Sequence, residues 1–234
     1  CRIEKITIDA PENENPYGID KDAFAILIYS NEKDCTGNII SQCNIMNYGR
    51  YNYGVGEYRY GKGIGLTRHP GTSKVCRNNV IKNNFVSNCF TSMYCNSAEN
   101  NVIQGNIFNK AIGYNHDKNI HALNISIERC KNISIFGNQI NETDFTIGSH
   151  GMYISGCEKC TVMSNIFYKN KGSGIKVRFT GDPPVVDVYN TITGNVCIDN
   201  GQPEGSGNGI HLQACSEWHT VSGNVCVNNK NCGI

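Results

Sequence analysis

The sequence predicts an all-β solenoid, a single domain over residues 1–234 in which coils of short strands stack along one axis. Two near-duplicate segments, Asn-Thr-Ile-Thr-Gly-Asn-Val-Cys at 190–197 and His-Thr-Val-Ser-Gly-Asn-Val-Cys at 219–226, lie 29 positions apart. A Gly-Ile-x-hydrophobic segment at 174–177 returns at 209–212. The composition agrees, because 25 Gly and only 6 Pro suit tight turns between short strands. Such a period indicates repeats that bury their apolar faces only by stacking.

The N-terminal part of the chain fits this repeat loosely. Residues 5–9 and 23–30 are predicted strands, because their apolar residues alternate or run together between turn residues. Residues 47–75 are predicted to leave the stack as a loop rich in tyrosine and glycine, with Tyr58 and Tyr60 among five tyrosines. This loop is either a self-packed surface segment or an aromatic lip on which sugar rings stack.

From about residue 77 onward the repeat is regular. Each unit is predicted to contain a short strand, a bend that ends in Asn, a second short strand, a variable loop and a third strand. The bend asparagines are separated by 22 to 32 residues: Asn84, Asn106, Asn138, Asn165, Asn195 and Asn224. Asn tolerates the left-handed backbone of a bend, and stacked Asn side chains can hydrogen-bond from coil to coil. Insertions are therefore expected in the loops, while the coil itself stays constant.

The 13 cysteines are predicted to fill the core as small apolar residues with free thiols. An odd number cannot all pair within one chain. Cys197 and Cys226 take the same place in successive units, as core residues would. Cys157 and Cys160 have the spacing of half a zinc knuckle, but the repeat offers no matching second pair. They are therefore interpreted as turn and core residues, and no metal site is predicted.

Charge and hydropathy exclude some classes of partner. The formal net charge is +1 at pH 7, so no overall field attracts nucleic acid. No apolar run approaches the ~20 residues of a membrane-spanning helix. The sequence begins with Cys1 and stops within a repeat at Ile234, so it is expected to be part of a longer protein.

Residues 149–156 read Ser-His-Gly-Met-Tyr-Ile-Ser-Gly. Together with the bend units and the Gly-Ile strands, this segment resembles the repeats of the pectate-lyase-like superfamily of right-handed parallel β-helix proteins. The resemblance is clear over residues 79–234 and loose over residues 3–46. It implies a single-stranded right-handed parallel β-helix with about 20–35 residues per coil. It specifies the fold well and the activity poorly, because function has to come from a site.

One exposed row of side chains is the candidate site. Because alternate residues of a strand face the same side, Ile175 and Val177 are predicted to face the core, which leaves Lys176 and Arg178 outside. The same parity in the other coils, with parallel strands ~4.8 Å apart, predicts one column on the surface. Its members are Tyr94, His121, Tyr153, Lys176 and His211, with Asn96, Arg178 and Gln213 beside it.

The resemblance implies action on an acidic polysaccharide, because members of the superfamily cleave such polymers by β-elimination, hydrolyse them or epimerise them. Elimination at a uronic acid needs a base for the proton α to the carboxylate, and positive charge to neutralise that carboxylate. Lys176 is expected to be the base and Arg178 the neutralising group. Alternative bases or proton donors are His121, His211 and Tyr153. The residues expected to bind substrate are Tyr94, Asn96, Gln213, Asp117, Tyr58 and Tyr60.

We therefore expect a lyase-like, carbohydrate-active protein that is secreted to the extracellular space or the cell surface. A glycan-binding module, such as an adhesin or a tail-fibre rod, would use the same side chains without turnover. A passive module is expected to hold them in coil-to-coil pairs, whereas a lyase leaves Lys176 or a histidine free. A purely structural stalk predicts that no contiguous column exists.

A glycoside hydrolase is a weaker alternative. It needs two carboxyl groups ~5–9.5 Å apart, and the predicted column contains none. Acidic residues expected in loops could still assemble such a pair: Asp117, Asp144, Asp182, Asp187 and Glu204. The loop that contains Asp117 is also a candidate contact for substrate or for Ca²⁺, and no other cofactor is predicted. His150 is expected to cap a turn.

Overall fold

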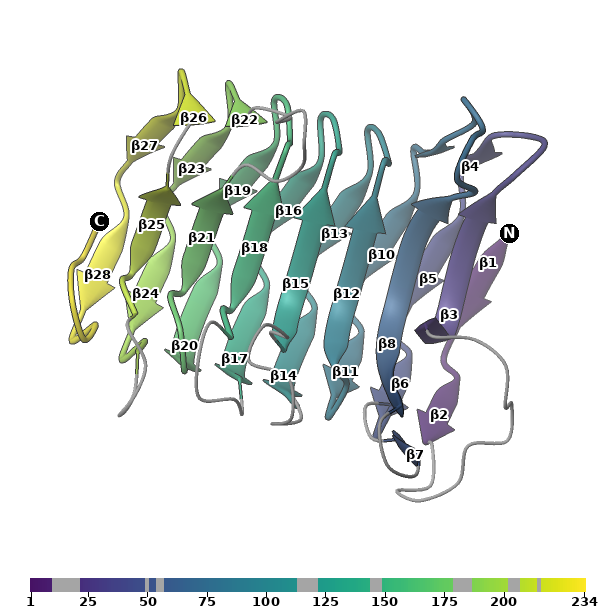
Figure 1. Cartoon of the computed structure of the whole chain (residues 1–234), viewed down its shortest axis with the longest axis horizontal. Helices are drawn as coiled ribbons and strands as arrows, with labels where there is room; N and C mark the ends of the chain where they lie inside the picture. The colour runs from purple at the N-terminus through teal and green to yellow at the C-terminus, as the bar shows by residue number, and fades with distance from the viewer. Residues whose placement is uncertain are drawn as a thin grey trace.

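The structure, a computed structural model, describes residues 1–9, 22–48, 51–53, 57–112, 122–143, 149–178, 187–201, 207–213 and 216–234. Strands are the only regular secondary structure in these ranges. Most of them form three long parallel sheets that run along the axis of the solenoid (Figure 1). The predicted right-handed parallel β-helix is therefore confirmed.

Each full coil contributes one strand to each sheet. Sheet 1 contains β1 (Arg2–Glu4), β5 (Ile39–Ser41), β10 (Val80–Lys82), β13 (Val102–Gln104), β16 (Ser134–Phe136), β19 (Thr161–Met163), β23 (Thr191–Thr193) and β27 (Thr220–Ser222). Sheet 2 contains β2 (Thr7–Asp9), β6 (Asn44–Met46), β11 (Phe85–Ser87), β14 (Ile107–Ala111), β17 (Gln139–Thr143), β20 (Ile166–Asn170), β24 (Val196–Ile198) and β28 (Val225–Val227). Sheet 3 contains β3 (Asp22–Ser30), β8 (Glu57–Arg68), β12 (Thr91–Asn96), β15 (Leu123–Glu128), β18 (Met152–Ser155), β21 (Ile175–Arg178) and β25 (Ile210–Gln213).

The core follows from the side-chain parity of these short strands. In a three-residue strand only the central side chain faces inward, and this position is apolar in coil after coil. In sheet 1 the fully buried residues include Ile40, Ile81, Ile103, Ile135, Val162 and Ile192. Their in-register stacking buries apolar surface that a single coil could not bury, which is why the coils are stable only as an array.

An asparagine ladder fixes the bend between sheets 1 and 2. Asn138 Oδ1 accepts hydrogen bonds from the main-chain N–H and the side-chain amide of Asn106 at 2.9 and 3.0 Å. Its own Nδ2 donates to Asn165 Oδ1 at 2.9 Å, and the pattern continues through Asn195 to Asn224. The predicted stacking is confirmed.

The left-handed residue of each bend, however, is not the ladder asparagine but the residue before it. These residues have φ between 54° and 63°: Asn83, Gly105, Gly137, Ser164, Gly194 and Gly223. The division is physical, because the ladder residue must aim its amide along the axis while its neighbour reverses the chain. Gly tolerates that reversal without steric cost.

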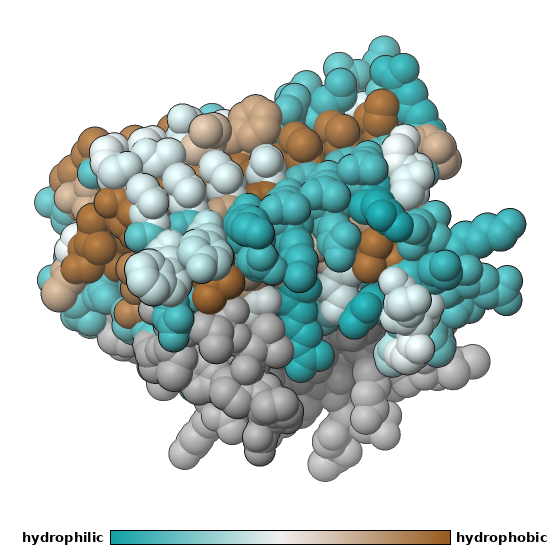
Figure 2. Space-filling view, turned by 90° about the horizontal axis from the view of Figure 1, so that it is seen from above, coloured by the Kyte–Doolittle hydropathy of each residue, from teal (hydrophilic) through white to brown (hydrophobic). Residues whose placement is uncertain are grey.

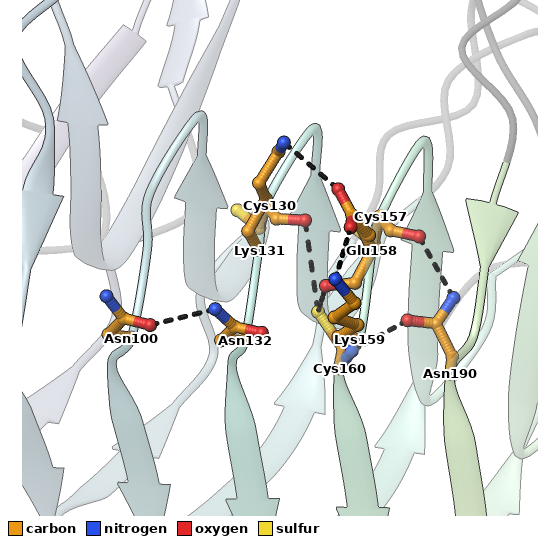
Figure 3. A network of polar contacts seen from close by, with 9 residues as sticks. All are labelled: Asn100, Cys130, Lys131, Asn132, Cys157, Glu158, Lys159, Cys160 and Asn190. Atoms are coloured by element: carbon orange, nitrogen blue, oxygen red, sulfur yellow. Dashed lines mark hydrogen bonds and ion pairs between the residues drawn. The ribbon is translucent and has the colours of Figure 1, made fainter.

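Two further strand pairs lie in the turns between sheets 3 and 1. They are β4 (Cys35–Thr36) with β9 (Cys76–Arg77), and β22 (Asp187–Val188) with β26 (Ser216–Glu217). Figure 2 shows the molecule from above in the orientation of Figure 1, and hydrophilic residues cover the middle of the surface in that view. Glu158, in one such turn, forms ion pairs with Lys131 at 3.0 Å and with Lys159 at 2.9 Å (Figure 3).

Cys157 and Cys160 flank this turn and are fully buried, so their interpretation as turn and core residues is confirmed. Cys157 Sγ donates to Ile127 O at 3.4 Å, and Cys160 Sγ lies 3.7 Å from Glu158 O. Cys197 on β24 and Cys226 on β28 are free thiols at matching positions of neighbouring strands, as predicted for core residues.

The predicted loop over residues 47–75 is wrong for β8, which lies in sheet 3 between β3 and β12. The reason is a local break in side-chain alternation, with the one-to-one register on both sides kept. Ile64 is fully buried, and a Cβ on its neighbour Gly63 would also lie in the core, 2.6 Å from Val86 Cγ1. Two consecutive inward positions break the alternation on which strand prediction depends. β7 (Tyr51–Tyr53) pairs antiparallel with β8 and is the part that departs from the parallel stack.

Candidate functional site

The candidate site lies on the outer face of sheet 3, where the strand register sets the rows of side chains. One row runs through Leu27, Gly65, Tyr94, Ser126, Tyr153, Lys176 and His211. The structure thus brings Tyr94, Tyr153, Lys176 and His211 into the predicted column, with Lys176 directly between Tyr153 and His211.

The position expected for His121, between Tyr94 and Tyr153, is taken by Ser126. The strand of that coil is β15, which begins at Leu123 and supplies Ile125 and Ile127 to the core. The loop before β15 is therefore longer than the repeat suggested. His121 itself lies outside the described residues.

A second row runs beside the first and contains a carboxylate that the sequence prediction missed. Asn96 pairs with Glu128, Glu128 pairs with Ser155, and Arg178 pairs with Gln213. The described members of the predicted column include no carboxylate, but Glu128 stands in the row beside it on the same face. The alternation Ile-Ser-Ile-Glu at 125–128 carried the signal, since it places Glu128 outward once the strand is located correctly.

The N-terminal half of the face is held by hydrogen bonds. Ser126 Oγ donates to Glu128 Oε1 at 2.8 Å, and Tyr94 Oη and Asn96 Nδ2 each lie 3.5 Å from Oε2. Asn96 Nδ2 also donates to Tyr94 Oη at 2.8 Å. Lys62 Nζ covers the Tyr94 ring, 3.9 Å from its centroid. We call Tyr94, Asn96, Ser126 and Glu128 the paired half.

The C-terminal half differs. It contains Lys176, Arg178 and His211, which we call the basic half. No described residue forms a hydrogen bond or an ion pair with these three side chains. Lys176 and His211 are half-buried and Arg178 is exposed. Burial, with the charge of Arg178 second, lowers the pKa of Lys176 below its ordinary range. Burial, with the charge of Lys176 second, lowers the pKa of His211.

Tyr153 stands at the boundary between the two halves. Burial raises its pKa, the charge of Arg178 opposes that rise, and the charge of Glu128 adds to it. Its ring stacks on His150 with centroids 6.5 Å apart. His150 Nδ1 accepts a hydrogen bond from the Ser173 N–H at 2.9 Å, so the expected turn-capping role of this histidine is confirmed.

Asp187 corrects another prediction, because it is a fully buried residue of β22 rather than a loop acid. Its Oδ1 accepts from the Cys157 N–H at 2.8 Å, while Oδ2 is buried with no partner in the described part of the chain. Burial raises the pKa of this carboxyl to about 7. It is enclosed in the turn and cannot face a second carboxylate across a glycosidic bond.

The remaining predicted residues are only partly described. Gln213 lies beside Arg178, and its Oε1 is buried without a hydrogen-bond partner in the described ranges. The backbones of Tyr58 and Tyr60 lie in β8, but their side chains are outside the description, so the aromatic lip stays a prediction. Asp117 and the loop acids Asp144, Asp182 and Glu204 also lie outside the described residues.

The comparisons with solved structures agree with this fold. The A-module of the mannuronan C-5 epimerase AlgE6 from Azotobacter vinelandii is similar at a TM-score of 0.50 and 14% identity, over 87% of this chain and 56% of that chain. A mutant of the periplasmic alginate epimerase AlgG is similar at a TM-score of 0.54 and 15% identity, over 87% of this chain and 47% of that chain. The chain thus spans about half the length of these epimerases. At such low identity the likeness shows the fold alone.

A search of curated proteins finds no match. In the described residues there is no helix of the length and apolarity needed to cross a membrane. One protein-family model matches residues 114–234, which is just over half of the sequence and includes both β18 and the whole basic half. By this match the chain belongs to the family described as periplasmic copper-binding protein (NosD).

Proposed function

We propose that the chain acts on a uronic-acid polysaccharide by removing the proton α to the uronate carboxylate, and that β-elimination follows. The observation that carries this proposal is the basic half. Lys176 lies between Tyr153 and His211 on neighbouring strands, and Arg178 stands one position away on the same face. A chain of net charge +1 that gathers unpaired cations in one place suits a polyanionic ligand.

The chemistry assigns a role to each side chain. Lys176 Nζ takes the C5 proton, and its lowered pKa increases the fraction of free amine available for this step. The electrons move into the carboxylate, which becomes an enediolate facing the Arg178 guanidinium. The C4–O bond then breaks, and the leaving oxygen takes a proton from Tyr153, whose raised pKa keeps the phenol protonated.

The comparisons support the same first step. An enzyme that epimerises C5 of a uronate must also remove the C5 proton, and it differs only in returning a proton to the opposite face. The two solved relatives are named as epimerases of mannuronan and alginate. The family name and one of these relatives are periplasmic, which supports a location outside the cytoplasm.

Copper is in the family name, but the described residues do not fit a copper site. Copper sites are built from Cys, Met and His, with cysteine bound as thiolate. The described ranges contain no group of three or more His, Cys, Asp or Glu that could hold a metal ion. Burial raises the pKa of Cys76 to about 11 and of Cys89 to about 12, which favours the protonated thiol. No step is therefore assigned to copper.

A non-catalytic glycan-binding module is the second candidate, and the paired half favours it. Tyr94, Asn96 and Glu128 hold one another in place, as a preformed recognition surface would. The two candidates make different demands on the basic half, because binding needs only its charge and catalysis needs a free base.

Solvent exchange tests both candidates. The protein is incubated with uronic-acid polymers in D₂O, and deuterium at C5 is followed by NMR together with the ultraviolet absorbance of unsaturated sugar ends. We expect the absorbance to rise in the wild type, to stay flat in Lys176→Ala, and to rise as in the wild type in Lys82→Ala on the outer face of sheet 1. A rise in absorbance indicates elimination, because the unsaturated product keeps no hydrogen at C5, whereas deuterium at C5 without absorbance indicates epimerisation. Binding with neither signal would overturn the catalytic proposal in favour of the binding module.

A further inference from the structure

We infer that Glu128 selects a polymer whose uronic acids are widely spaced, so that the sugar two units from the bound uronate carries no carboxylate. The inference rests on the proposed function, because it takes the basic half as the place where a uronate binds. It goes beyond that function by naming the class of polymer.

The first step concerns how Glu128 is held. Three neutral donors surround its carboxylate: Ser126 Oγ at 2.8 Å from Oε1, and Tyr94 Oη and Asn96 Nδ2 each at 3.5 Å from Oε2. Hydrogen bonds from neutral groups fix the carboxylate without cancelling its charge.

The second step concerns the cations nearby. No described cation forms an ion pair with Glu128. Lys62 Nζ lies against the ring of Tyr94 rather than against the carboxylate. Ser155, on the strand between, separates Glu128 from Arg178 along the row. The negative field of Glu128 nevertheless reaches along the face, since it adds to the rise in the pKa of Tyr153.

The third step concerns distance. Glu128 is on β15 and Arg178 on β21, with one strand between them. Two strand spacings are about 10 Å, which is close to two sugar units of an extended glycan running along the axis. A second uronate at that distance would place its carboxylate against Glu128, and like charges so placed repel.

The two ends of the face therefore suit different parts of a polysaccharide. The basic half receives a uronate carboxylate. The paired half, with carboxylate, amide and hydroxyl groups, accepts hydrogen bonds from the hydroxyl groups of an uncharged sugar. A homopolyuronate violates this pattern, and so does a strictly alternating polymer, because its uronates recur every second sugar. A polymer in which several neutral sugars separate the uronates satisfies it.

The test is the affinity of the whole chain for three polymers, measured by titration calorimetry: polygalacturonate, hyaluronan and deacylated gellan, in which neutral sugars separate single glucuronates. We expect the wild type to bind gellan most tightly per uronate. Glu128→Gln should tighten binding of polygalacturonate and hyaluronan about fivefold and leave gellan within about twofold. The matched control is Glu142→Gln, an exposed carboxylate on β17 of sheet 2, which should change none of the three.

Ser126→Ala keeps the charge of Glu128 and removes one donor, so it should preserve the preference for gellan and separate charge from packing. Equal changes for all three polymers in Glu128→Gln would overturn the inference and leave the proposed function standing. If the wild type bound none of the polymers, the proposed function and the inference would both fail. Gain of polygalacturonate binding in Glu128→Gln, with loss of the absorbance of unsaturated sugar ends in Lys176→Ala, would support both.

Discussion

The paired half and the basic half occupy the same sheet and continue the same rows of side chains, the first on the six-residue strands β12 and β15 and the second on the four-residue strands β21 and β25. In the paired half Ser126, Tyr94 and Asn96 satisfy Glu128. In the basic half Lys176, Arg178 and His211 have no such partners in the described structure. Burial lowers the pKa of Lys176 and of His211, and the charges of Arg178 and Lys176, respectively, add to these shifts. The same parallel stacking therefore carries both a stabilising patch and a reactive patch, and the two differ in which side chains face outward.

The comparison also shows where stability has been given up. Holding Lys176 and Arg178 on one face of β21, with no anionic partner in the described residues, is unfavourable because like charges repel and the half-buried ammonium loses hydration. Side chains kept unpaired at such a cost are typical of functional sites. Substitutions at Arg178, Glu128, Lys176 and His211 test this difference, and one at Asp187 tests the buried carboxyl of β22; the largest expected effect comes first.

Removing Arg178 should break the basic half as a catalytic centre. We expect Arg178→Ala to slow the formation of unsaturated sugar ends about 10²–10³-fold, because the guanidinium is the group that neutralises the developing enediolate. Arg178→Lys should recover part of the rate, since it keeps the charge but not the planar fork. Arg129→Ala, on an exposed turn, is the control. An unchanged rate of elimination in Arg178→Ala would show that the two halves do not differ in the way described.

Asp187→Asn should stabilise the protein above neutral pH. The folded pKa of about 7 lies above the ordinary 3.8, so the folded state binds more protons between these values and stability falls as the pH rises through them. At pH 8 the substitution should raise the free energy of unfolding by on the order of 2–4 kcal/mol. At pH 4 the gain should be small. Urea titrations at both pH values, with Asp199→Asn as control, measure the difference, and an equal gain at both would contradict the assignment.

Truncation should affect the two halves in opposite directions. Glu128→Ala leaves Ser126, Tyr94 and Asn96 without their acceptor and should lower the free energy of unfolding by about 1 kcal/mol. Lys176→Ala relieves repulsion by Arg178 and should leave stability unchanged or slightly higher. Urea titration at pH 7 provides the measurement. A larger loss from Lys176→Ala than from Glu128→Ala would reverse the comparison.

His211 should give the smallest effect. Its folded pKa is below the ordinary 6.5, so the unfolded state binds the proton more readily and stability falls as the pH drops below about 6.5. Because the ring is partly exposed, the loss should be less than about 1 kcal/mol. Thermal unfolding of His211→Gln between pH 5 and pH 7 should show a flatter pH profile than the wild type. Identical profiles would assign the pH dependence to other groups.

Much of the fold could be predicted from the sequence because the same sequence motifs recur in successive coils. The Asn bends and the Gly-Ile strands each recur, so one misread copy is corrected by the next. The same repetition placed Lys176 beside Tyr153 and His211. It failed at Gly63, where the side-chain alternation changes within one strand, and at Glu128, where a long connection shifts the start of β15.

Asp187 could not have been predicted by the same means. It occupies the turn position that cysteines hold in earlier coils, and only the three-dimensional stacking on Cys157 shows that the carboxyl is buried. Loop length and side-chain desolvation are not periodic properties. They therefore escape any method that works by aligning repeats.

The asparagine ladder makes the coils interchangeable units of length. Asn165 and Asn195 stack on each other 30 residues apart, and Ile166 pairs with Val196 immediately after them. Excising residues 166–195 would therefore rejoin the chain in phase and shorten the rod by about 4.8 Å. It would also bring His211 next to Tyr153 in place of Lys176. Such a fold can exchange its reactive groups by gaining or losing whole coils, without redesigning its core.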